Sequence, residues 1–259
     1  MKPIIVKLGG SVITDKRKPF TVRKSVLGRL AKELSDARGP LVVVHGGGSF
    51  GHTVAAKYNI AKGYRSRKQL MGLSLTHRSM ERLNAQVVEA LQGAGLPAVA
   101  VQPSACAVVS NGRIVSMELR PVRKMLELGI VPVLYGDAVT DAKKGMCILS
   151  GDQLMSRLAS ELGASRVIVG ADVDGVFTSN PKKDRGARHL DRITPSTKLS
   201  LGGAGVKDVT GGMKNKVDEL MALARIGIES EIANAMRPGV MKKLVSGGRG
   251  LGTIIGGSR

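Results

Sequence analysis

The chain has 259 residues, enough for one large α/β domain or two small ones with a sizeable core. Aromatic residues make up only 2%, so we expect a core of aliphatic side chains. No apolar run approaches the ~20 residues that a membrane-spanning helix needs. The 40 lysines and arginines against 20 acidic residues give a formal net charge of +20, which attracts anions such as nucleic acids or small phosphorylated ligands.

Cysteine usage and the first residues bear on the compartment. Cys106 and Cys147 form neither a CxxC pair nor a disulfide framework, which is typical of a reducing environment. The first apolar stretch is short and runs into glycines, unlike the longer apolar stretch of a signal peptide. We therefore expect a cytoplasmic protein with no membrane contact.

The apolar pattern predicts a parallel sheet with crossover helices, because short β-branched runs alternate with longer helical patterns. The expected strands cover residues 3–8, 41–45, 98–102, 130–135, 166–170, 230–233 and 252–255. The expected helices cover residues 23–37, a segment from about 52, 68–92, a segment ending at 128, 153–162 and 212–226. Residues 108–115 read as a hairpin with Asn111-Gly112 in a type I′ turn. Without repeats or a clear linker, residues 1–259 form one expected domain with two lobes.

The first expected strand ends in a glycine-rich turn, which consists of Lys7, Leu8, Gly9, Gly10 and Ser11. Two glycines allow backbone amides to approach an anion closely, and a lysine beside them supplies positive charge. A tight turn with a surface lysine is the alternative interpretation of this segment taken alone.

A second glycine-rich turn, residues 45–52 (HGGGSFGH), follows the second expected strand. Its glycines formally match the GxGxxG pattern of dinucleotide-binding proteins, which place an acidic residue about 20 positions later. No acidic residue follows until Glu81, so that interpretation fails. The turn instead indicates an anion-binding group of amides that opens a helix, with His52 about one turn in. His45, His77 and His189 are interpreted as structural.

Two separate glycine-rich turns in one sheet favour two phosphate groups bound head to head. The chain contains no GxxxxGK[ST] sequence, which excludes a Walker-type nucleotide site. Phosphoryl transfer needs mainly positioning and charge neutralisation, which amides and lysines provide.

Motifs over nearly the whole chain resemble those of the amino acid kinase superfamily and, within it, the archaeal type of isopentenyl phosphate kinase family. They occur in the same order, at residues 7–11, 45–52, 135–137, 150–154, 171–178 and 208–213, followed by Lys216. The SFGH ending of the second turn, Lys16, and residues 102–104 point to the narrower family, although fosfomycin kinases share part of this pattern. The resemblance implies a three-layer αβα sandwich around a mostly parallel sheet, in a homodimer.

The resemblance also implies an activity: transfer of the ATP γ-phosphate to isopentenyl phosphate, with Mg²⁺. It implies that Lys7 to Ser11 hold the transferring phosphate and that Lys16 neutralises charge in the transition state. It places Gly47, His52 and Gly151 on the substrate, and it places Gly48, Asp172, Gly212 and Lys216 on ATP. Asp152 would orient the lysines or the metal, and no protein ligand to the metal is assigned. The implied catalytic residues are Lys7, Lys16, His52 and Asp152.

Several alternatives stay open. Another small acceptor, such as fosfomycin, a nucleoside monophosphate, glutamate or carbamate, would suit the same fold. A nucleic-acid-binding regulatory protein is favoured only by the net charge, since no RNP motif or zinc-finger spacing occurs. Asp137 and Asp174 could serve the site or only hold loops. Met71, Leu75, Ser79 and Leu83 share one predicted helical face, which is either a prenyl pocket or core.

Overall fold

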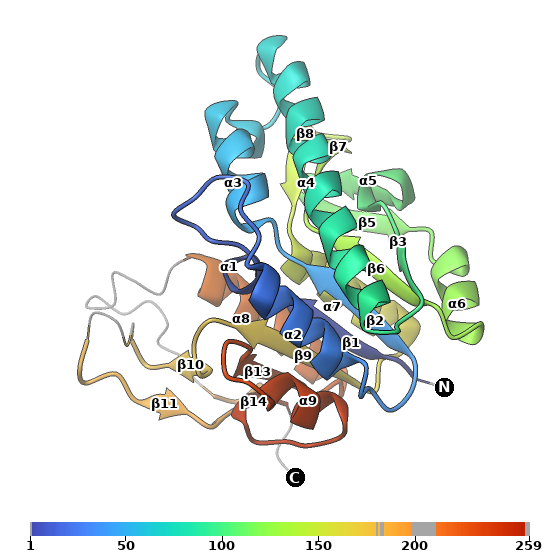
Figure 1. The fold of residues 1–259 in the computed structure, drawn as a ribbon. Coiled ribbons are helices and arrows are strands. Elements are labelled where there is room, and N and C mark those ends of the chain that lie inside the picture. Colours follow the sequence, from blue (N-terminus) through green and yellow to red (C-terminus); the bar gives the residue numbers. More distant parts are fainter. Residues whose placement is uncertain (1, 180, 182–183, 198–210, 257–259) are drawn as a thin grey trace.

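The central feature of the fold is one large sheet. The computed structural model describes residues 2–179, 181, 184–197 and 211–256 (Figure 1). The sheet contains β1 (Ile4–Leu8), β2 (Leu41–His45), β3 (Ala98–Ala100), β6 (Val131–Tyr135), β9 (Arg166–Ala171), β12 (Arg192–Ile193), β13 (Ser230–Asn234) and β14 (Gly252–Ile255). The strand order is β12-β14-β13-β9-β1-β2-β6-β3.

Most neighbouring strands in this sheet are parallel. β1 lies in the middle and pairs in parallel with β2 on one side and β9 on the other. Among the described strands of this sheet, the one antiparallel pair joins β13 to β14. All five residues of β1, β2 and β6 are buried, as expected for strands covered on both faces.

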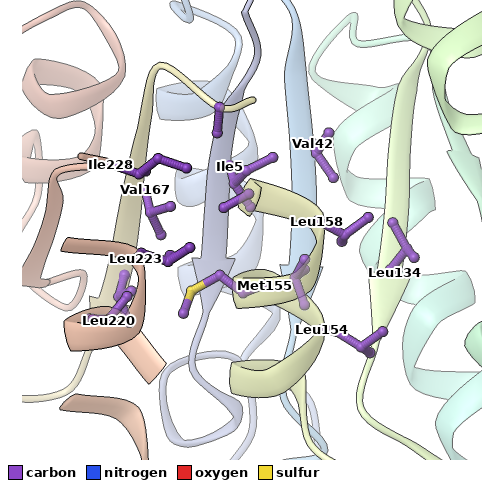
Figure 2. Packing of buried hydrophobic residues seen from close by; sticks show 14 of the residues in the cluster. Ile5, Val42, Leu134, Leu154, Met155, Leu158, Val167, Leu220, Leu223 and Ile228 are labelled. Atoms are coloured by element: carbon purple, nitrogen blue, oxygen red, sulfur yellow. The ribbon is translucent and has the colours of Figure 1, made fainter. Parts of the chain in front are cut away.

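Helices cover both faces of the sheet and produce three layers. α2 (Lys24–Leu34), α4 (Lys68–Gly93) and α9 (Val240–Val245) share a core with Val6 and Leu8 of β1. α7 (Gly151–Leu162) and α8 (Gly211–Arg225) cover the other face, where Figure 2 shows Leu154, Met155, Leu158, Leu220 and Leu223 over Ile5, Val42, Leu134 and Val167. α6 (Arg120–Glu127) packs on this side through Val122. The predicted αβα sandwich is confirmed.

Smaller elements surround the sheet. The predicted hairpin is β4 (Ala107–Ser110) and β5 (Arg113–Met117), and its turn residues Asn111 and Gly112 have φ of 52° and 77°. A second hairpin, β7 (Asp137–Asp141) and β8 (Gly145–Leu149), was not predicted, nor was the β10 (Val176–Phe177) and β11 (His189–Leu190) pair. The remaining helices are α1 (Gly10–Ile13), α3 (Gly48–Lys57), η1 (Ile60–Lys62) and α5 (Pro103–Cys106).

The topology places a site at the carboxyl ends of β1 and its neighbours. The chain builds outward from β1 in both directions, through β2 on one side and β9 on the other. Ligands of open α/β sheets bind where the strand order reverses in this way. Among the described helices, none is long and apolar enough to cross a membrane.

Candidate active site

The first glycine-rich turn carries the chain from β1 into α1. The Gly9 amide donates to the Gly170 carbonyl at 2.9 Å, which ties the turn to the end of β9. The first amides of a helix have no acceptor within that helix, which leaves the Gly10 and Ser11 amides available to a ligand. Leu8 is buried in the core, and its carbonyl accepts from the Gly46 amide at 3.0 Å. Leu8 therefore joins the two turns through its backbone, and its side chain does not reach the site.

The second glycine-rich turn packs directly against the first. Gly48 has a φ of +48°, and a Cβ placed there would lie 2.0 Å from Thr14 Oγ1 and 2.6 Å from the Gly10 carbonyl oxygen. The Thr14 hydroxyl donates to that carbonyl at 2.7 Å and accepts from the Ser49 amide at 3.0 Å. The backbones meet closely because neither turn has a side chain at the contact.

A third helix start, at α7, completes the arrangement. Ser150 caps α7 by accepting from the Gln153 amide, which leaves the Gly151 and Asp152 amides without an acceptor inside the helix. A Cβ at Gly151 would lie 3.4 Å from Lys7 Cε. The start of α7 thus lies beside the Lys7 side chain, and α1 begins two residues after the end of β1, which carries Lys7. The positive ends of these helices favour an anion there.

Three charged side chains form a compact cluster at this point. Asp152 Oδ1 accepts from Lys7 Nζ at 2.7 Å and from Lys216 Nζ at 2.8 Å. The side chains are 15%, 5% and 12% exposed for Asp152, Lys7 and Lys216, so water screens the charges little. One carboxylate therefore holds two cations from β1 and α8, and the cluster retains an excess of positive charge.

The pKa values in the cluster follow from burial and from the second cation. Burial and the neighbouring Lys216 lower the pKa of Lys7 to about 7, and Asp152 only partly opposes this shift. Burial disfavours the charged form of Asp152, but the two ammonium groups outweigh it and lower the pKa of that carboxyl. An incoming phosphate would favour the charged form of Lys7.

The structure places the other predicted nucleotide-site residues on the β9 side of the cluster. Ser11 Oγ donates to Asp172 Oδ1 at 3.0 Å, which links the first turn to the end of β9. Gly212 lies in the first turn of α8, with no atom within 4 Å of the position a Cβ would take. The earlier part of its motif, residues 208–210, lies outside the described residues.

Lys16 and His52 approach each other on the β2 side. Loss of hydration around the imidazole and the charge of Lys16 both lower the pKa of His52. The basic neighbour Arg17 is bound to Asp15, with Nε 3.2 Å from Oδ1. In the described residues Lys16 has no such carboxylate, which distinguishes it from Arg17. Gly47 caps the start of α3 beside them.

The other histidines have structural partners. His45 is buried, stacks on Tyr135 and lies 3.1 Å from Asn84 Oδ1, and burial lowers its pKa to about 4. His77 Nδ1 lies 2.8 Å from Asp137 Oδ1, which joins α4 to β7. His189 lies in β11 and contacts Asp191 and the Asp174 carbonyl.

Asp137 and Asp174, whose roles the sequence left undecided, also have structural contacts. Asp174 accepts from Asn234 Nδ2 at 3.0 Å and from Arg237 Nη2 at 2.9 Å, so it holds the segment after β13. Burial raises the pKa of Asp137, although the bond from His77 opposes this shift. Sequence reasoning did not pair Asp137 with His77, because the hairpin that carries Asp137 was not predicted.

The predicted apolar face of α4 does not form one pocket. Leu83 is buried in the core below the helix, and Met71 is 60% exposed to solvent. Leu75 and Ser79 line an outer groove between α3 and α4. A different apolar group lies between α3, α4 and the β7–β8 hairpin, and it consists of Ala55, Tyr58, Ile60, Leu73, Ala138, Met146 and Ile148.

Known proteins resemble this chain over most of its length. The amino acid kinase family profile matches residues 2–234. The chain is 44% identical to an isopentenyl phosphate kinase of Methanothermobacter thermautotrophicus, over 98% of this chain and 99% of that protein. It belongs to the isopentenyl phosphate kinase family.

Two further relatives agree. The family member from Methanocaldococcus jannaschii is 37% identical, over 83% of this chain and 85% of that protein. A crystal structure of an isopentenyl phosphate kinase superposes with a TM-score of 0.86 and 40% identity, covering 98% of this chain and 99% of the other. The predicted family and fold are therefore confirmed.

Proposed function

We propose that the protein transfers the γ-phosphoryl group of ATP to isopentenyl phosphate and thereby makes isopentenyl diphosphate and ADP. The observation that carries this proposal is the direct contact between the two glycine-rich turns beside Lys7, in a member of the isopentenyl phosphate kinase family. The contact brings two anion-binding groups of amides together, as head-to-head binding of two phosphates requires.

The transferring phosphate would lie over the first turn. The Gly10 and Ser11 amides have no acceptor within α1, and the Lys7 side chain lies beside the start of α7. Donors fixed in this way stabilise the charge that develops on the equatorial oxygens without reorganising during the reaction. The buried site makes each of these interactions stronger than in water.

The acceptor phosphate would lie on the β2 side, held by the amide regions of Gly47 and Gly151 and by His52. An ionised phosphate oxygen is already a nucleophile, so the site needs no dedicated base. That oxygen attacks the γ-phosphorus, and the bond from phosphorus to the bridging oxygen breaks, so that ADP leaves with the electron pair. Lys16, near His52, would neutralise charge between the two reacting groups.

ATP would extend from the first turn toward β9 and α8. Gly48 would face its phosphates from the second turn, and Lys216 would bind them from α8. Asp172, bonded to Ser11, and Gly212, in the first turn of α8, would contact the nucleotide. Asp152 would hold both lysines in place before ATP arrives and so act as a positioning residue.

Mg²⁺ would be held mainly by the nucleotide. No group of three His, Cys, Asp or Glu side chains able to hold a metal gathers within the described part of the chain. Mg²⁺ commonly keeps several waters and binds substrate phosphates with one or two carboxylates, which fits a site that offers Asp172 beside the phosphate turn. When bound, the ion would neutralise phosphate charge.

The prenyl group would lie over the apolar group between α3, α4 and β7–β8. Ala55 lies one turn beyond His52 on α3, and Leu73 lies one turn before His77 on α4. Both side chains and Ile148 are only partly buried and pack around Ala138. An apolar surface next to the proposed phosphate site would favour a hydrocarbon acceptor over a charged one.

Two chains would pair along one edge of the molecule. β3, the β4–β5 hairpin and α6 lie along that edge (Figure 1). The exposed apolar side chains there are Val99 of β3, Val108 and Val115 of the hairpin, and Leu128 at the end of α6. Exposed apolar side chains gathered in this way are typical of an interface. Sedimentation velocity should give the mass of a dimer for the unaltered chain. The double variant Val108→Asp with Val115→Asp should give half that mass. A monomer mass for the unaltered chain would contradict the pairing.

A coupled assay of ADP formation tests the function. Isopentenyl phosphate should stimulate ADP release far above the rate with ATP alone, whereas fosfomycin, uridine monophosphate, glutamate and carbamate should not. If one of the other acceptors gives the highest kcat/KM, the proposed substrate is wrong. A salt-sensitive complex with duplex RNA and no acceptor-dependent ADP would instead favour a nucleic-acid-binding role.

A further inference from the structure

The outer side of α3 and α4 is hollowed, away from the phosphate turns. The hollow is a half-open groove of about 370 Å³, within the range of small-molecule sites. Its apolar lining comes from Phe20, Val54, Tyr58 and Leu75, and the surface inside is mostly apolar. Phe20 is 51% exposed and Leu75 is 38% exposed. The groove thus presents aromatic and aliphatic surface that the fold leaves uncovered.

Three cations stand around this apolar surface. They are Lys57 of α3 and Arg78 and Arg82 of α4. None of the three forms an ion pair with a carboxylate of the described residues. Arg78 and Arg82 are four residues apart on one helix, and like charges at this spacing destabilise a helix. A bound anion would offset that repulsion, and two guanidinium groups suit phosphate oxygens well.

The groove and the proposed acceptor site lie on different faces of α3 and α4, and Tyr58 borders both. At 3.6 residues per turn, Val54 lies about 200° around α3 from His52, and Leu75 lies about 200° around α4 from His77. His52 and His77 face the other side, where His77 binds Asp137. α3 and α4 lie side by side, as Figure 1 shows, so the helix pair stands between the groove and the β7–β8 hairpin.

We propose that this groove binds a prenyl diphosphate, with the hydrocarbon chain on the apolar lining and the diphosphate on Arg78, Arg82 and Lys57. Lys57 Nζ lies over the Tyr58 ring, 5.7 Å from its centroid, and no carboxylate of the described residues pairs with any of the three cations. An apolar lining beside such cations selects an amphiphilic anion. The choice of a prenyl chain rests on the proposed function, whose product is the first member of that class. A free ligand fits better than a membrane lipid, because the apolar surface is concave and Ser79 within it is buried.

A ligand in the groove would touch the loop that carries Lys16. Phe20 forms part of the groove, packs edge-to-face on Phe50 with ring centroids 5.8 Å apart, and has a strained φ of +52°. The loop is closed by the Asp15 amide, which donates to the Thr21 carbonyl at 2.9 Å. Since Lys16 lies between these anchors, occupancy of the groove would change kcat, and added acceptor would not displace the ligand.

Titration calorimetry with geranyl diphosphate, without ATP, tests the site directly. Arg78→Gln with Arg82→Gln should weaken binding about tenfold or more, because two charged hydrogen bonds are lost. Leu75→Trp, which fills the groove, should weaken it as well. Arg65→Gln with Arg67→Gln removes the same charge from the segment just before α4, outside the groove, and serves as the matched control. Equal weakening in the control would mean that only the net charge attracts the ligand, and the proposal would be wrong.

Two more measurements separate the other outcomes. His52→Ala should keep geranyl diphosphate binding; if it abolishes binding, the ligand occupies the acceptor site and the groove is not a site. Binding to phosphatidylglycerol vesicles that depends on Arg78 and Arg82, with geranyl diphosphate binding unchanged in the same variants, would assign the groove to a membrane surface and overturn the proposal. Because none of these measurements needs turnover, failure of the kinase assay would leave them readable.

Discussion

Lys7 and Lys216, from opposite ends of the chain, bind the same oxygen of Asp152, at 2.7 Å and 2.8 Å. Before a nucleotide arrives, this carboxylate is the counter-ion that lets two cations stay close together in a poorly hydrated place. The phosphates of ATP would take over part of that role. The relationship therefore connects the stability of the free protein to its affinity for anions.

Replacing Asp152 by Asn should destabilise the free protein. It leaves two buried cations without their carboxylate, which we expect to lower the free energy of unfolding by about 3 kcal/mol at pH 6. The loss should be smaller at pH 9, where Lys7 can release its proton. Denaturant unfolding at the two pH values measures this. Saturating ADP should restore most of the stability in the variant, and an equal loss with and without ADP would contradict the assigned role.

The low pKa of Lys7 predicts a pH dependence of nucleotide capture. Since the pKa is about 7 in the free protein, kcat/KM for ATP should fall as the pH rises above 7 and Lys7 loses its charge. The free energy of unfolding should change in the opposite direction, because between pH 7 and the ordinary value of 10.5 the unfolded chain binds one more proton than the folded one. In Lys7→Arg the fall in kcat/KM should disappear, whereas a flat profile for the unaltered protein would exclude the assignment.

Gly48→Ala should push the two glycine-rich turns apart. The added Cβ would lie 2.0 Å from Thr14 Oγ1, at a φ of +48° that disfavours any side chain. We expect kcat/KM to fall more than about tenfold, since a small misplacement of reacting groups has a large kinetic effect. Gly28→Ala in α2 is the matched control, because no atom lies within 4 Å of its Cβ position. Full activity in Gly48→Ala would show that the contact between the turns is not needed.

The fold was largely predictable where local pattern and burial agree. β1, β2 and β9 are short apolar runs because both of their faces are covered. The Asn111-Gly112 turn was predictable because asparagine and glycine tolerate the positive φ that this turn type requires. The β7–β8 hairpin was not predicted because its formation depends on contacts with residues far away in the sequence. Its buried Asp141 accepts from the amides of Asn111 and Gly112, some 30 residues earlier in the chain, and no local signal indicates such a contact.

The grouping of Lys7, Asp152 and Lys216 was predictable from motifs but not from local physics. Lys7 and Asp152 are 145 residues apart, so only a family resemblance could pair them before the structure was known. The sequence predicted that α3 begins at about residue 52, but it begins at Gly48. Glycine is a weak helix former, and here the helix start is set by the packing of this turn on Thr14 and Met80. The spacing in α4 misled the prenyl assignment, because each step of four residues advances about 40° around a helix. Leu83 therefore lies about 120° around α4 from Met71, with Leu83 in the core and Met71 in solvent.

His52 and Lys16 should differ in their kinetic effects. His52→Ala should raise KM for isopentenyl phosphate and lower kcat/KM, while ATP binding and folding stay unchanged, and His52→Gln should retain part of the rate because it keeps a donor. Lys16→Ala should lower kcat more than it raises KM, since its partner is charge that is present mainly in the transition state. Lys18→Ala, in the same loop, is the control. If Lys16→Ala changes only KM, the residue binds the ground state instead.

The most direct test of the central claim is a competition reaction followed by ³¹P NMR. Isopentenyl phosphate, fosfomycin and uridine monophosphate, at equal concentration, compete for limiting ATP and Mg²⁺ in one sample. The account predicts that the diphosphate signals of isopentenyl diphosphate and ADP grow together, in equal amounts, while the other two acceptors stay unchanged. Phosphorylation of fosfomycin or uridine monophosphate ahead of isopentenyl phosphate would contradict it.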